Sequence, residues 1–92
     1  MRAKMTIESV QVYRVSNGYE QETLKFRAVS KKEPYGEDGM DEDNTYAKFS
    51  PSASLEITIA NPALLGKFNP GETFYVDFTP VPQTTENPPT IA

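Results

Sequence analysis

The sequence contains no cysteine, no histidine and no tryptophan among its 92 residues. Without cysteine there is no disulfide and no thiolate nucleophile, and without histidine there is no imidazole base or histidine zinc ligand. These absences exclude Cys–His and Ser–His–Asp catalysis and the usual zinc hydrolases. We therefore expect a protein that is not an enzyme and that uses no cofactor or metal.

Long apolar runs are missing as well. The first residues, MRAKMTIESV, lack the apolar run of about 7 or more residues that a signal peptide needs, and no segment approaches the ~20 apolar residues of a membrane span. We expect a protein that is made in a cytoplasm and has no membrane partner. A chain of 92 residues has surface for one core only, which predicts a single domain.

The apolar residues alternate with a period of two, which is typical of β-strands. Ala3, Met5 and Ile7 share one parity and Val10 shares the other, which predicts a β-bulge near Glu8–Ser9. Further alternating runs predict strands around 24–28, 45–50, 55–59 and 74–78. The phenylalanines expected to point inward from these strands are Phe26, Phe49, Phe74 and Phe78.

Proline and glycine mark the ends of these runs. The segment Asn61–Gly66 predicts one short helical turn, and Asn69–Glu72 predicts a type II turn. Together these elements predict an all-β fold, a small five-stranded barrel or sandwich with the helical turn before the last strand. An SH3-like barrel is favoured over an OB-like barrel, because an OB-fold places its helix between the third and fourth strands. The predicted domain spans 1–80, and 81–92 form an extended Pro-rich tail.

An acidic loop dominates the charge, since residues 33–44 hold six of the 13 acids and no base. Such a loop could bind a divalent cation, dock on a basic partner such as an inhibited host enzyme, or cover the basic face of its own domain as a nucleic-acid mimic. It could equally be only a solvated loop, which is the commoner outcome for a run of charge.

Basic residues recur at outward positions of the predicted strands. Such a face could follow a phosphate backbone while a tyrosine stacks on a base, although a polar outer face is also what any half-buried sheet requires. The candidate nucleic-acid face consists of Arg2, Lys4, Lys25, Arg27, Tyr46 and Lys48. Tyrosine tolerates partial exposure and is favoured at interfaces, so we expect interface residues among Tyr13, Tyr19, Tyr35, Tyr46 and Tyr75.

The tail is the third candidate. Its proline content prevents it from adding a central strand, and an extended arm can bind a neighbouring protein through main-chain contacts and apolar side chains. The residues of the tail expected to contact a partner are Val81, Pro82, Pro88, Pro89 and Ile91.

The segment from Phe49 to Val81 resembles short proteins encoded by tailed bacteriophages. The shared pattern comprises Ser50–Glu56 (SPSASLE), the pair Asn61–Pro62, and a P-G-x-x-F-Y-V-D-F-T-P ending over 70–80. No catalytic residue follows from this resemblance. Combined with the tail, it implies a virion protein, a capsid decoration or cement protein whose arm binds a major capsid protein or another virion protein, or a second copy of itself. The alternative is a phage single-stranded nucleic-acid-binding module.

Overall fold

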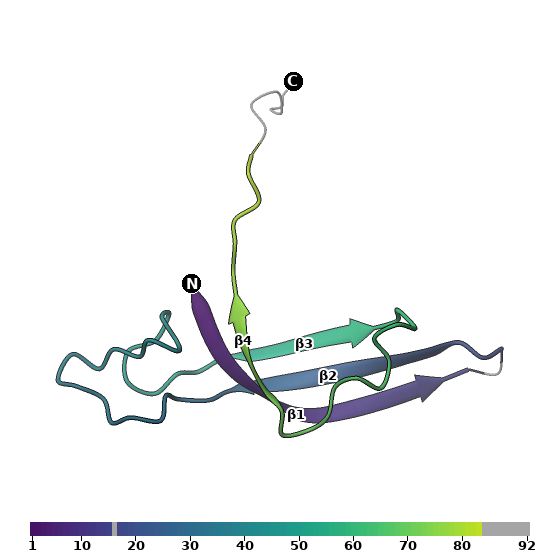
Figure 1. Ribbon diagram of the computed structural model, residues 1–92, viewed down its shortest axis with the longest axis horizontal. Coiled ribbons are helices and arrows are strands. Elements are labelled where there is room, and N and C mark those ends of the chain that lie inside the picture. The colour runs from purple at the N-terminus through teal and green to yellow at the C-terminus, as the bar shows by residue number, and fades with distance from the viewer. Residues whose placement is uncertain (16, 84–92) are drawn as a thin grey trace.

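The described part of the chain forms one antiparallel sheet of four strands (Figure 1). The computed structural model describes residues 1–15 and 17–83. The strands are β1 (Arg2–Arg14), β2 (Glu20–Ala28), β3 (Ser54–Ile59) and β4 (Thr73–Asp77), in the order β3-β2-β1-β4. No helix forms within the described residues. The predicted all-β class is confirmed.

A β-bulge divides β1, the long central strand. The register between β1 and β2 shifts between Ile7 and Ser9, where the change in apolar parity predicted it. Before the bulge, Arg2–Thr6 pair with β4, while the longer part Met5–Arg14 pairs with β2. The bend turns the two ends of β1 in different directions, so β4 crosses the direction of β2 and β3 (Figure 1).

The core lies on the inner face of this bent sheet. As the alternation predicted, Leu24 and Phe26 point inward and the intervening Lys25 is exposed. Phe74 of β4 packs edge to face against Phe26, with ring centroids 6.2 Å apart. The buried apolar side chains are Ala3, Met5, Ile7, Leu24, Phe26 and Ile59.

The connection from β3 to β4 covers part of the core through Leu65 and Phe68. At its start, the Leu64 amide donates to the Asn61 carbonyl at 2.9 Å, which closes a turn rather than the predicted helical turn. The predicted type II turn does form, because the Glu72 amide donates to the Asn69 carbonyl at 3.2 Å and Gly71 has a φ of 93°.

The predicted strand at 45–50 is wrong, and the described residues hold four strands instead of five. A strand there would need a free edge to pair with. Thr45 does reach β1, where its amide donates to the Arg2 carbonyl and its Oγ1 accepts from the Arg2 amide, both at 2.9 Å. The chain then turns away, and only an isolated bridge between Met40 and Lys48 remains.

The loss of this strand reverses the predicted side-chain directions within it. Tyr46, placed outward by the alternation, packs against the core. Phe49, placed inward, is 46% exposed and takes a φ of 62°. Phe78, which the alternation of the predicted strand at 74–78 placed inward, is also exposed, because β4 ends one residue earlier at Asp77.

The sheet is open rather than closed into a barrel. In the described part of the chain β3 and β4 are its two edges and do not pair with each other. With four strands, the turn at 61–66 lies between the third and fourth strands, which is the position of the helix in an OB-fold. The reason for favouring an SH3-like topology is therefore removed.

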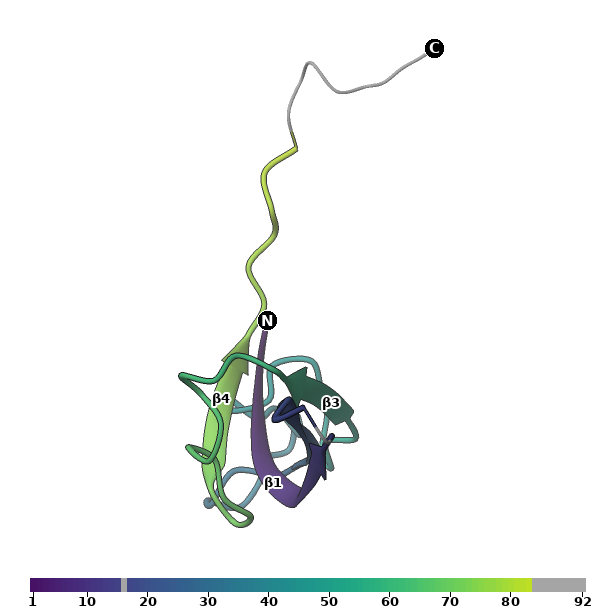
Figure 2. The ribbon, with the colours of Figure 1, turned by 90° about the vertical axis from the view of Figure 1, so that its right-hand side faces the viewer.

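The chain leaves the domain beside its N-terminus. The Phe78 amide donates to the Met1 carbonyl at 2.9 Å, which is the last backbone contact of this edge. Residues 79–83 then run away from the sheet (Figure 2), and Val81 is 85% exposed. Val81 and Pro82 of the predicted tail contacts are exposed here, whereas Pro88, Pro89 and Ile91 lie outside the described residues.

Candidate functional site

Arg2, at one end of the predicted basic face, is neutralised by β4. Its Nε lies 2.7 Å from Asp77 Oδ1 and its Nη2 lies 3.2 Å from Asp77 Oδ2, which is a two-pronged ion pair. The hydrogen bond and charge of Arg2 hold the pKa of Asp77 below its usual value, and the same pair raises the pKa of Arg2. The guanidinium also lies over the Tyr75 ring, 4.3 Å from its centroid.

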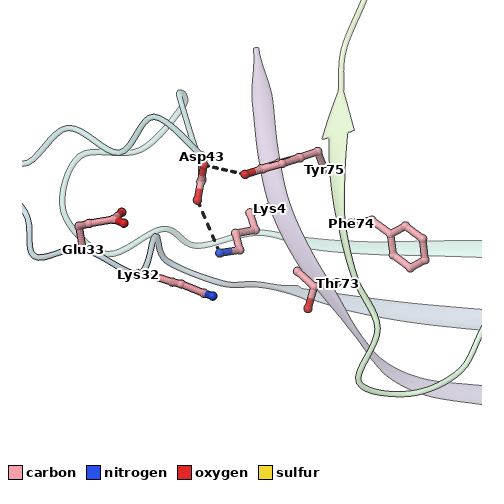
Figure 3. A pocket seen from close by; sticks show the side chains of 7 residues that line it. All are labelled: Lys4, Lys32, Glu33, Asp43, Thr73, Phe74 and Tyr75. Atoms are coloured by element: carbon pink, nitrogen blue, oxygen red, sulfur yellow. Dashed lines mark hydrogen bonds and ion pairs between the residues drawn. The ribbon is translucent and has the colours of Figure 1, made fainter.

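Lys4 is neutralised by the acidic loop. Its Nζ lies 3.5 Å from Asp43 Oδ2, and the Tyr75 hydroxyl donates to Asp43 Oδ1 at 3.0 Å (Figure 3). The hydrogen bond to Asp43 and the charge of that carboxylate raise the pKa of Tyr75. Asp43 therefore connects the acidic loop to β1 and β4 at once.

The rest of the predicted basic face does not form one surface. Lys25 lies 3.9 Å from Glu56 of β3, and both side chains are exposed. Arg27 is exposed on the outer face of β2, and Lys48 is exposed in the loop. Tyr46 points to the other side of the sheet, where burial and the charge of Asp41 raise its pKa. The structure therefore separates these residues into three ion pairs, two dispersed cations and one tyrosine on the opposite side of the sheet.

A polar cleft of about 530 Å³ opens between the acidic loop and β4 (Figure 3). Lys4, Asp43 and Tyr75 point toward one another in it, whereas the Phe74 ring points away. Because its charged groups are of both signs and two of them are already paired, the cleft has no surplus charge to select an ion. The residues that line it are Lys4, Lys32, Glu33, Asp43, Thr73, Phe74 and Tyr75.

Two buried polar residues fix the acidic loop, and the sequence reasoning missed both. Asp41 is 2% exposed and Asn44 is fully buried. The Asn44 Oδ1 accepts from the Lys4 amide at 2.8 Å, and its Nδ2 donates to the Val29 carbonyl at 2.8 Å and to Asp41 Oδ2 at 3.1 Å. An Asp followed three residues later by Asn was the available signal, since such pairs close local turns.

The Asp41 carboxylate is stabilised although it carries no ion pair of its own in the described structure. Burial by itself raises its pKa, but hydrogen bonds from the Asn44 side chain and from the amides of Asp43, Lys31 and Asn44 outweigh burial and lower it. These bonds make Asp41 a structural acceptor. Among residues 1–15 and 17–83, no three acidic side chains are grouped closely enough to hold a metal ion.

A small apolar groove of about 160 Å³ lies on the inner side of the sheet, lined by the start of β1 and by residues 52–55 at the start of β3. Tyr46 and Leu55 form part of its wall, and Phe78 lines it at the point where the chain leaves the domain. Met1 and Phe78 are both more than half exposed beside it. The lining residues are Met1, Ala3, Met5, Tyr46, Ser52, Ala53, Ser54, Leu55 and Phe78.

The tyrosines expected at interfaces divide into two groups. Tyr13, Tyr19 and Tyr75 are about half exposed, whereas Tyr35 and Tyr46 are more buried. Tyr13 and Tyr19 flank the β1–β2 turn, and the Tyr19 hydroxyl donates to Gln21 Oε1 at 3.0 Å.

Comparisons of the chain with protein-family models, with curated proteins and with solved structures found no match. The resemblance to phage proteins therefore stays a prediction. No helix in the described residues is long and apolar enough to cross a membrane.

Proposed function

We propose that this chain is a structural protein of a bacteriophage virion, a capsid decoration protein that binds through the edge where its tail leaves the domain. The observation that carries the proposal is the concentration of exposed apolar groups at this edge. Met1 and Phe78 lie beside the apolar groove, and Val81 stands clear of the domain. Exposed apolar groups that are contiguous favour a protein partner.

The chemistry of the tail fits an extended contact. Proline has no amide N–H, so Pro80 and Pro82 cannot extend the ladder of β4 and instead keep the chain extended. One small domain offers few contacts. Because the tail is joined to the domain, a contact made by the tail and a contact made by the domain on the same shell act as one linked unit, and this linkage strengthens the attachment.

The proposal is tested by deleting residues 81–92 and measuring how much of the protein purified virions contain, by quantitative mass spectrometry. We expect a large fall in occupancy with unchanged circular dichroism and thermal unfolding, because the deleted segment lies beyond the last strand. The matched point variant is Val81→Asp, with the exposed outer-face Gln11→Asp as the control for added charge. Unchanged occupancy in the deletion variant would contradict the proposal.

A second candidate function is the binding of single-stranded nucleic acid, now restricted to the outer face of β2. The fold favours it in two respects that are shared with an OB-fold: the long bent β1 pairs with both β2 and β4, and a turn precedes β4. OB-folds bind oligonucleotides over the face of their second and third strands. Lys25 and Arg27 would be its phosphate contacts. The ion pairs of Arg2 and Lys4 and the net charge of -4 weigh against it.

Fluorescence anisotropy with a labelled oligonucleotide decides this second candidate. If it is right, the affinity falls steeply with salt, and the double variant Lys25→Ala/Arg27→Ala reduces both the affinity and its salt dependence. Lys67→Ala, in the β3–β4 connection, is the control. Absence of binding at low salt would dispose of the candidate.

A further inference from the structure

The apolar groove differs in its charge from two other clefts of the described structure. The polar cleft contains Glu33 and Asp43, and a third cleft beside the β1–β2 turn contains Glu20. The apolar groove is lined by no charged side chain. Every copy of this chain carries a net charge of -4, so two copies can approach most closely where neither contributes an acid.

The segment that leaves the domain at this groove has matching chemistry. Pro80, Val81 and Pro82 are uncharged and exposed. Extended proline-containing segments bind grooves lined by aromatic side chains, because proline gives an apolar surface that is already ordered. Tyr46 and Phe78 supply aromatic walls. A volume of about 160 Å³ suits one or two small side chains rather than a drug-sized ligand, which needs about 300–1,000 Å³.

The groove cannot take this segment from its own chain as the chain lies. Residues 79–83 run away from the sheet in both views, and they make no hydrogen bond back to the described part of the domain (Figures 1 and 2). The residue before a proline is restricted to an extended conformation, and here both Thr79 and Val81 precede a proline, which favours an extended course for this segment. The donor must therefore be another molecule.

We propose that the apolar groove binds the Pro80–Val81–Pro82 segment of a second copy of this chain, and that two copies exchange these segments reciprocally. The inference deepens the proposed function and depends on the same edge of the molecule. The segment begins two residues after Phe78, which is itself a wall of the groove, so the donor segment and the acceptor groove of one copy lie next to each other, as reciprocal exchange about a two-fold axis requires. Reciprocal exchange gives a closed pair.

Sedimentation of the full chain over a range of concentrations tests the proposal. We expect a monomer–dimer equilibrium that Val81→Asp weakens by about tenfold or more, the scale set by the burial of one aliphatic side chain. Ser52→Arg places a bulky charge on the wall of the groove and should weaken it similarly. Ser50→Arg is the matched control, because Ser50 is an exposed serine two residues away that does not line the groove.

Mixing the two weakened variants gives the sharper test. Val81→Asp retains an intact groove and Ser52→Arg retains an intact segment, so a mixed pair keeps one of the two contacts whereas a pair of either variant alone keeps none. The mixture should therefore associate more tightly than either variant alone and less tightly than the wild-type chain. The proposal is overturned if the wild-type chain stays monomeric, if Ser50→Arg weakens the pair as much as Ser52→Arg, if the mixture associates no more tightly than either variant alone, or if open higher oligomers form.

The sedimentation and virion-occupancy measurements together distinguish a failure of this inference from a failure of the proposed function. A monomeric wild-type chain whose virion occupancy still depends on residues 81–92 would overturn the exchange and leave the proposed function standing. A dimer of the expected behaviour whose occupancy is insensitive to those residues would support the exchange and overturn the proposed function.

Discussion

Replacing Asn44 should unfold the acidic loop from the sheet and remove a large part of the stability of the domain. Asn44 is fully buried and forms hydrogen bonds with three buried or part-buried groups, namely the Lys4 amide, the Val29 carbonyl and the Asp41 carboxylate. Asn44→Ala leaves all three without this partner. Each buried group that loses its partner costs about 1–3 kcal/mol, and partial relaxation brings the expected total to about 3–4 kcal/mol.

Asn44→Asp is the more discriminating change because it alters one atom and a charge. The new oxygen would lie where Nδ2 now donates to the Val29 carbonyl and to Asp41 Oδ2, so two hydrogen bonds become contacts between acceptors. An unpaired buried charge beside a second carboxylate costs about 3–5 kcal/mol. The stability of a 92-residue domain is about 5–14 kcal/mol, so this variant is expected to be marginal.

The pH dependence of Asn44→Asp has a definite sign. Protonation of the new carboxyl restores an O–H donor toward Asp41 and removes the repulsion, so folding favours the protonated form and raises the pKa of that carboxyl. Stability held by a raised pKa is present at low pH and is lost as the pH rises through it. The difference in the free energy of unfolding between this variant and the wild-type chain should therefore become smaller as the pH is lowered from 7 toward 5.

Urea denaturation followed by circular dichroism measures these differences, since the chain has no tryptophan. Asn17→Asp is the control, because Asn17 is exposed and its oxygen accepts from the Tyr19 amide at 3.0 Å, a role that a carboxylate can keep. The control should change stability by no more than about 0.5 kcal/mol. A cost below about 1 kcal/mol for Asn44→Ala would refute the reasoning.

Three further predictions concern single side chains. Gly39→Ala should cost more than 1 kcal/mol in urea denaturation, because Gly39 has a φ of 71° and a Cβ there would lie 2.6 Å from the Phe49 ring, whereas Gly18→Ala, with a φ of 87° but open space, should cost about 1 kcal/mol. The lowered pKa of Asp41 gives stability that is present above its unfolded pKa and lost as pH falls through the folded pKa, so acid titration should show a destabilising step below about pH 4 that Asp41→Asn lacks. Glu22→Gln should stabilise the domain by about 1 kcal/mol, because Glu22 is 4% exposed and has no ion pair in the described structure, and a glutamine oxygen can still accept from the Gly66 amide as Glu22 Oε2 does at 3.0 Å; a clear loss in thermal unfolding would contradict this.

Local alternation predicted the paired strands well. The parity change at Glu8–Ser9 located the bulge, and the inward positions of Leu24 and Phe26 were correct. These features depend on which face of a strand is buried, and the alternation of apolar and polar residues along the strand identifies that face. The position of Phe74 on the inner face was predicted for the same reason.

The same signal failed at 45–50 because a strand also needs a partner edge. The edge of β1 beyond the end of β2 is short, and backbone contacts of Thr45 with Arg2 together with the side chain of Asn44 occupy it. Nothing in the local pattern of 45–50 reveals that competition. The residues that fill the edge belong to a loop whose charge suggested a solvated segment.

Charge counting separated an acidic loop from a basic body, and the fold brings the two together. Asp43 forms an ion pair with Lys4, and Glu42 lies 3.1 Å from Lys31, so two carboxylates of the acidic loop form ion pairs within the domain. This is the contact expected of a loop that covers its own basic face, although it reaches only one residue of that face. A surface whose charges are already paired gains little by binding a phosphate backbone, because existing pairs must first be broken. The apolar edge at Phe78 has no such internal competitor, and for this reason a protein partner is the stronger expectation.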